Sequence, residues 1–148
     1  MLRFVLLLLS LSIVACTSEP LPPSKVRGMV TGGNPAVETY SWCSGFYAAR
    51  AEYFRTGASN YRSNKQLKIA KAFRKAADNS ASEETPETLA RLGDVSSMIE
   101  TATEEYRVLL PKAEYDRPTR GSLNQDLTWC SHMASAGIFP EKEFPSSG

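Results

Sequence analysis

The chain has 148 residues, of which 42% are hydrophobic and 22% charged, a length and composition that suit one globular domain with a modest core. Its 17 basic and 16 acidic residues leave a formal net charge of +1 at pH 7, and it holds a single histidine. So balanced a chain argues against a nucleic-acid partner, which usually needs a net basic domain.

The first fifteen residues have the pattern of an export signal. A positive charge at Arg3 precedes an apolar run from Phe4 to Val14. At about 1.5 Å rise per residue, this run reaches about 16 Å as a helix, roughly half of a hydrocarbon core. It therefore reads as a signal-peptide core rather than a membrane span, and we expect residues 1–15 to be removed.

The apolar run ends in Ile13-Val14-Ala15-Cys16. This tetrapeptide resembles the lipobox of bacterial lipoprotein precursors, and the resemblance covers only the first sixteen residues. It implies that Cys16 is the lipidation site: its sulfur takes a diacylglyceryl group, a signal peptidase cuts before it, and the new α-amino group is often acylated too. Several palmitate-like chains hold a protein on a membrane where one gives marginal binding. The alternative is an ordinary signal peptide that happens to carry a cysteine near its end.

The residue after Cys16 indicates which of the two membranes of a Gram-negative bacterium would hold the protein. Gram-negative lipoproteins retained in the inner membrane typically carry aspartate there, whereas this chain has Thr17. The resemblance therefore implies the periplasmic face of the outer membrane rather than the inner membrane. Residues 16–33 are rich in proline and glycine and hold few large apolar residues, so we expect a lipidated, flexible tether that reaches about 55 Å when fully extended.

Two cysteines remain, Cys43 and Cys130, and an oxidising compartment is where such a pair normally forms a disulfide. Trp42-Cys43-Ser44 recurs as Trp129-Cys130-Ser131, either through a worn duplication or because two helices flank one bridge. We favour the second interpretation because nothing else repeats. A catalytic or metal-binding role for these thiols is not favoured, since no CxxC pair or Cys/His cluster is present.

Four segments have helical periodicity, and local signals set their bounds. Asn34-Pro35 and Gly57 bound a helix over 35–56, and a capping box of Ser63 with Gln66 begins a helix over 64–79. Thr85-Pro86 and Pro111 bound one long helix over 86–110. A second capping box, Ser122 with Gln125, begins a helix over 123–136.

No window alternates with a period of two, so no sheet is expected. Residues 34–137 are therefore predicted to form an all-α four-helix bundle, with the first and last helices side by side and joined by Cys43 and Cys130. Residues 138–148 look like a frayed tail that Phe139 and Phe144 dock to the bundle or to a partner.

The charges are segregated along the chain. Residues 50–75 hold eight basic residues against Glu52 alone, and residues 78–105 hold eight acidic residues against Arg91 alone. One basic helix face is a candidate contact surface for anionic lipid heads or an acidic partner: Lys65, Lys68, Lys71, Arg74 and Lys75. The alternative is that the adjacent acidic helix neutralises this face. We favour the alternative because the two blocks are neighbours in sequence.

The sequence shows no catalytic constellation. Any nucleophile system would have to use His132, and a lone helical histidine is more often a surface or packing residue. The pairs Glu83-Glu84 and Glu104-Glu105 do not face each other, because adjacent helical positions point apart. We therefore predict no catalytic residue, no cofactor and no metal site.

These observations together predict a lipid-anchored domain that acts by contact with an envelope protein, as an accessory, adaptor or assembly subunit. A first alternative is a binding module for a small envelope ligand, such as a lipid or a peptidoglycan fragment, in a pocket inside the bundle. A second alternative is a hydrolase of cell-wall or lipid substrates, which requires His132 or a carboxylate pair to converge in a cleft.

Overall fold

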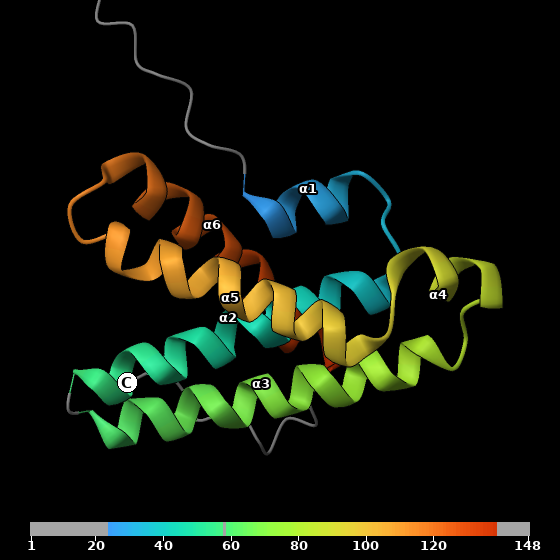
Figure 1. Ribbon diagram of the computed structural model, residues 1–148, viewed down its shortest axis with the longest axis horizontal. Helices are drawn as coiled ribbons and strands as arrows, with labels where there is room; N and C mark the ends of the chain where they lie inside the picture. The colour runs from blue at the N-terminus through green and yellow to red at the C-terminus, as the bar shows by residue number, and fades with distance from the viewer. Residues whose placement is uncertain (1–23, 58, 139–148) are drawn as a thin grey trace, which may run out of the picture.

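The computed structural model describes residues 24–57 and 59–138. These residues form six α-helices and one short π-helical segment, with no strand among them (Figure 1). The predicted all-α class is confirmed, and each of the four predicted helical segments lies in helices. The signal peptide, Cys16 and residues 139–148 fall outside the described residues.

Two long antiparallel helices, α2 (Ala36–Thr56) and α3 (Asn60–Ala81), pack along their whole length. Two hydroxyls bond across this interface: Ser44 donates to the Ala70 carbonyl at 2.9 Å, and Ser63 donates to the Ala51 carbonyl at 2.7 Å. Helix α3 begins four residues before the predicted start at residue 64. The Ser63 capping box is therefore wrong, because Ser63 lies inside the helix and its hydroxyl bonds to α2.

Helix α5 (Val95–Lys112) packs closely against α2. At Gly45 a Cβ atom would lie 2.5 Å from the Ala102 Cβ and 2.8 Å from the Ile99 carbonyl oxygen. Two helices approach this closely only where one presents no side chain, so glycine at position 45 sets the distance between α2 and α5.

The predicted single helix over 86–110 is wrong, because the structure divides it into α4 (Pro86–Leu92) and α5. Gly93 has a φ of +87°, which a residue with a side chain rarely adopts, and Asp94 caps α5 by accepting the Ser97 N–H at 3.0 Å. Apolar periodicity continues through both helices, so the sequence predicted one helix although Gly93 ends α4 and Asp94 caps α5.

The flexible tether predicted for residues 16–33 is corrected in its described part. Residues Lys25–Thr31 form helix α1, whose Val26 is fully buried and whose Met29 is 9% exposed. Ser24 caps this helix by accepting the Arg27 N–H at 3.1 Å. Val26 and Met29 share one side of a helix, and burying them offsets the cost of ordering a segment that holds Gly28.

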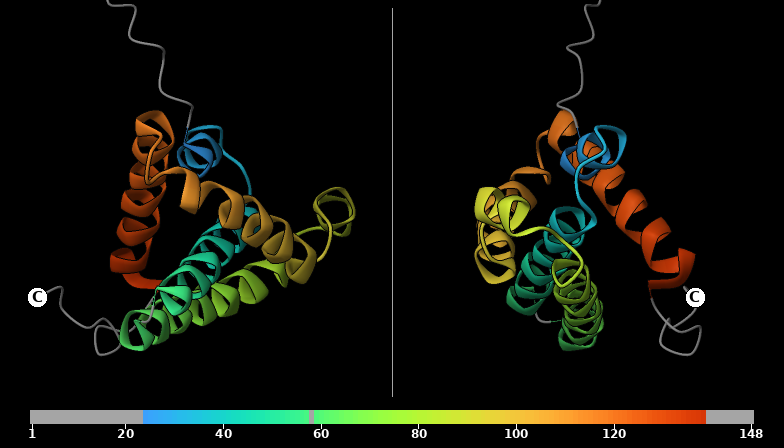
Figure 2. Two further views of the ribbon diagram at one scale, coloured as in Figure 1. Left: turned by 60° about the vertical axis from the view of Figure 1, so that its left-hand side comes forward. Right: turned by 90° about the vertical axis from the view of Figure 1, so that its right-hand side faces the viewer.

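Helix α6 (Arg117–Met133) begins before the predicted residue 123, because Asp116 caps it by accepting the Thr119 N–H at 2.9 Å. The π-helical segment Ala134–Ile138 follows it. The predicted side-by-side packing of the first and last predicted helices is replaced by a crossing, in which α6 runs across α2 and packs on α1 and α5 (Figure 2). Helices α1 and α3 lie on opposite sides of the molecule in all three views (Figures 1 and 2).

Candidate functional site

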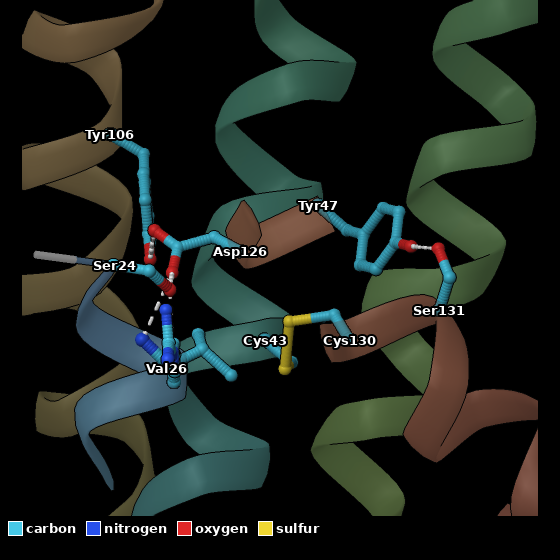
Figure 3. The surroundings of a disulfide bond; sticks show 9 residues. Ser24, Val26, Cys43, Tyr47, Tyr106, Asp126, Cys130 and Ser131 are labelled. Carbon is cyan, nitrogen blue, oxygen red and sulfur yellow. Dashed lines mark hydrogen bonds between the residues drawn. A yellow bond between two sulfur atoms is a disulfide. The ribbon is translucent and has the colours of Figure 1, made fainter. Parts of the chain in front are cut away.

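A buried carboxylate, Asp126, joins three segments that are far apart in the sequence. One oxygen accepts the Ser24 hydroxyl and the Val26 N–H, the latter at 3.0 Å, and the other accepts the Tyr106 hydroxyl at 2.9 Å. Figure 3 shows the Asp126 carboxylate of α6 between Ser24 at the start of α1 and Tyr106 of α5. Asp126 is 1% exposed, so these contacts replace its contacts with water.

Asp126 was missed in the sequence analysis, although a signal for it exists. Leu123, Asp126 and Cys130 are spaced by three and four residues, and all three are buried on the inward side of α6. An acidic residue at a buried position of an amphipathic helix needs dedicated partners. Those partners come from α1 and α5, so the sequence of α6 alone does not reveal them.

Burial raises the pKa of Asp126 above its usual range, and hydrogen bonds from Ser24, Val26 and Tyr106 act in the opposite direction. Burial, together with the Asp126 charge, raises the pKa of Tyr106, so its phenol keeps its proton and donates to the carboxylate. The cluster is closed to solvent and its partners are all within the chain. It is suited to clamping α1 onto the body of the protein.

A disulfide lies next to this clamp. The predicted pair is confirmed, because Cys43 of α2 and Cys130 of α6 are bonded, with 5.7 Å between their Cα atoms. Both cysteines are fully buried, and beside them the Tyr47 hydroxyl lies 3.1 Å from the Ser131 hydroxyl (Figure 3). This bridge fixes the point at which α6 crosses α2.

The residues considered for catalysis do not converge. His132 is exposed in the last turn of α6, and its side chain makes no hydrogen bond or ion pair with another described residue. Glu104 pairs with Arg107, and Glu105 lies 3.5 Å from the Lys25 ammonium group. Within residues 24–57 and 59–138, no group of three or more potential ligand side chains is arranged to hold a metal ion.

The basic surface on α3 is open. Four lysines share its outer side and form no ion pair with any residue that the structure describes; we call them the basic face: Lys65, Lys68, Lys71 and Lys75. Lys65 is half-buried and the other three are exposed. Buried residues of α3, including Ala70 and Phe73, lie on the opposite side and pack against the core.

Arg74, the fifth predicted contact residue, points elsewhere. Its guanidinium donates to the Ser96 hydroxyl of α5 at 2.8 Å and lies 4.0 Å from Asp78. We therefore leave Arg74 out of the basic face.

The favoured alternative, neutralisation of the basic helix by its acidic neighbour, finds no support in direct ion pairs and stays a prediction. No acidic residue of α4 or α5 forms an ion pair with α3 in the described part of the chain. Helix α3 packs mainly on α2, and the Glu104 and Glu105 carboxylates are paired with Arg107 and Lys25. Within residues 24–57 and 59–138, the basic face therefore has no ion-pair partner.

A shallow groove of about 340 Å³ lies on the surface between α1 and α6. Its walls are formed by Arg27, Asn124, Gln125, Thr128 and Trp129. It is open to solvent, unlike the pocket inside the bundle that a small-ligand binding module was expected to have.

None of the helices in residues 24–57 and 59–138 combines the length and apolar character needed to cross a membrane. Comparison with protein-family models, with curated proteins and with solved structures finds no match to this chain. The function is therefore inferred from the chain's own residues.

Proposed function

We propose that this protein is a lipid-anchored lipoprotein of the bacterial cell envelope that acts by contact, as an accessory, adaptor or assembly subunit, and that the basic face of α3 is its contact surface. One observation carries the proposal: four lysines face outward on one helix with no ion-pair partner in the described chain. An unneutralised row of like charges raises the free energy of the isolated protein slightly, and an anionic partner relieves that cost.

The position of α1 supports the anchored part of the proposal. Between Cys16 and Lys25 the chain reaches at most about 32 Å when fully extended. Helix α1 is clamped to the body through Asp126, and Lys25 adds contacts to Glu105 at 3.5 Å and to the Trp42 ring at 4.9 Å. A lipid on Cys16 would therefore hold the α1 side toward the membrane, with α3 on the opposite side of the molecule.

The anchor is tested by measuring the intact mass and the membrane fractionation of the protein from its native host, beside a Cys16→Ser variant. The proposal expects a membrane-bound form whose mass includes acyl chains, and a variant that loses both. Recovery of a soluble, unacylated wild-type product would overturn the lipid anchor.

The contact surface is tested by photocrosslinking in cells. A photoreactive residue at Lys68 is compared with one at Val108, which is 70% exposed on α5 and lies outside the basic face. The proposal expects a specific crosslinked product from position 68 that is absent from position 108. Equal products from both positions, or a product from position 108 alone, would overturn the assignment of the surface.

A further inference from the structure

We infer that the basic face of α3 binds a linear polyanion with regularly spaced carboxylates, the chemistry of a cell-wall glycopeptide, rather than a folded protein. This inference rests on the proposed contact function and names the partner of the same surface. It is carried by three features of the described residues: the spacing of the lysines, the chemistry around them, and the place of α3 relative to α1.

The lysines form a row. The spacings from Lys65 to Lys68, Lys71 and Lys75 are three, three and four residues, so all four side chains leave the same side of α3. At about 1.5 Å rise per residue, the row is about 15 Å long with a positive charge about every 5 Å. A row of cations at this spacing matches a chain of anions, because each ammonium group can meet a separate anionic group along the polymer.

The surroundings of the row are unlike the centre of a protein interface. Such interfaces are depleted in lysine and gain most of their free energy from buried aromatic and apolar side chains in a water-excluded centre. Around the lysines, α3 exposes Asn64 and two apolar side chains: Tyr61, which is 77% exposed one turn before Lys65, and Leu67, which is 42% exposed. Two such partly exposed side chains do not form a water-excluded centre. Lysine acts as a mobile point charge without the fixed fork of arginine, which suits a partner that has no single docked geometry.

The kind of partner that can bind the lysines is also limited by which side of α3 is buried and by where α3 lies relative to α1. A helix that inserts into a lipid surface needs an apolar side free to enter it, whereas the apolar side of α3 is buried through Ala70, Phe73 and Ala77. Helix α3 also lies opposite α1, the helix nearest to the proposed anchor. A polymer on the far side of the protein from its membrane satisfies both observations, and peptidoglycan with its peptide carboxylates is such a polymer.

The test is co-sedimentation of the full mature chain, made soluble by Cys16→Ser, with purified peptidoglycan sacculi over a range of salt concentrations. The test variant carries Lys65→Gln, Lys68→Gln, Lys71→Gln and Lys75→Gln. A matched control carries the same change of net charge on exposed residues of other helices: Arg55→Gln, Arg91→Gln, Lys112→Gln and Arg117→Gln. Both variants are checked for native helicity by circular dichroism before use.

The inference expects the wild-type affinity to fall linearly with salt on logarithmic axes, since counterions are released on binding. It expects the test variant to lose at least about tenfold in affinity, with the control within about twofold of wild type. Amidation of the carboxylates of the sacculi should abolish binding by the wild type. Equal losses in both variants would show that net charge alone matters, and would overturn the inference.

Three further measurements test other possible partners of the basic face. Tighter binding to vesicles of phosphatidylglycerol and phosphatidylethanolamine (3:7) than to sacculi would overturn the polymer in favour of a lipid surface. Self-association of the wild type in analytical ultracentrifugation, lost in the test variant, would overturn it in favour of a second copy. A folded acidic protein crosslinked from Lys68 without binding to sacculi would overturn this inference and leave the proposed contact function in place.

Discussion

The α1 side of the molecule and the outer side of α3 differ in whether their charged side chains have partners within the described chain. On the α1 side, Asp126 is buried and all three of its partners, Ser24, Val26 and Tyr106, come from within the chain. On α3, four lysines have no ion-pair partner among the described residues. The first arrangement stabilises the fold, and the second is free to bind something else.

This difference separates residues that hold the protein together from residues that are available for function. A buried carboxylate costs free energy unless it is fully hydrogen-bonded, so the Asp126 contacts are a condition of folding with α1 in place. Exposed lysines contribute little to stability in either direction. The comparison therefore predicts large effects on stability on the α1 side and nearly none on α3.

The largest expected effect is loss of the disulfide. Cys43 and Cys130 are separated by 87 positions, so the bridge constrains a long loop of the unfolded chain and should contribute about 4 to 5 kcal/mol in the chain-entropy model. The Cys43→Ala/Cys130→Ala double variant should unfold at a much lower urea concentration than wild type under non-reducing conditions. With reductant present, the two proteins should differ far less. Equal midpoints without reductant would contradict the predicted contribution.

The Asp126→Ala variant should be the next most damaging. It leaves the Ser24 hydroxyl, the Val26 N–H and the Tyr106 hydroxyl without their acceptor, at a cost of about 3 kcal/mol. Hydrogen exchange at the Val26 amide should accelerate more than exchange in α3. Asp94→Ala is the control, because Asp94 caps α5 at an exposed position and its loss should cost only about 1 kcal/mol.

The pH dependence of an Asp126→Asn variant sharpens this prediction. Since burial raises the pKa of folded Asp126 above its ordinary value of 3.8, the residue stabilises the fold most at low pH. This contribution is lost as pH rises through the folded pKa. Asparagine does not titrate, so the difference in free energy of unfolding between wild type and variant should be largest below pH 3.8 and should shrink as the pH rises. A difference that grows with pH would show that the pKa is lowered instead.

The Gly45→Ala variant tests how closely α2 and α5 pack in the centre of the molecule. The added Cβ meets the Ala102 Cβ at 2.5 Å, so α2 and α5 must move apart, at a cost of about 2 kcal/mol. Gly28→Ala in α1 is the matched control, because no atom lies within 4 Å of its added Cβ. That change should be neutral or stabilise the protein by about 0.5 kcal/mol. Thermal unfolding of both variants measures the contrast.

The smallest expected effect on stability comes from the basic face. Neutralising all four lysines should change the free energy of unfolding by less than about 0.5 kcal/mol, because exposed charges without partners contribute little. Urea unfolding of the variant with all four lysines changed to glutamine measures this. A loss of several kcal/mol would mean that the lysines support the fold, and the contrast between the two sides would fail.

Local patterns were enough to predict much of this protein from its sequence. Helical periodicity placed the helical segments, because the spacing of apolar residues reflects which side of a helix is buried. The pairing of Cys43 and Cys130 followed because they were the two cysteines left after Cys16. The bounds of α3 and α6 were missed, since serine and glutamine at capping-box spacing also occur inside helices.

Only the tertiary structure decided the rest. The segment Lys25–Thr31, part of the predicted tether, is helix α1, and Asp126, a hundred residues later, accepts its Val26 N–H. Among the described residues, the lysines of α3 have no ion-pair partner because α3 packs on α2 while Glu104 and Glu105 of α5 pair with Arg107 and Lys25. Both outcomes depend on which helices meet in space. Helix positions follow from short-range patterns, whereas the partner of a buried or charged side chain is set by contacts between segments far apart in the chain.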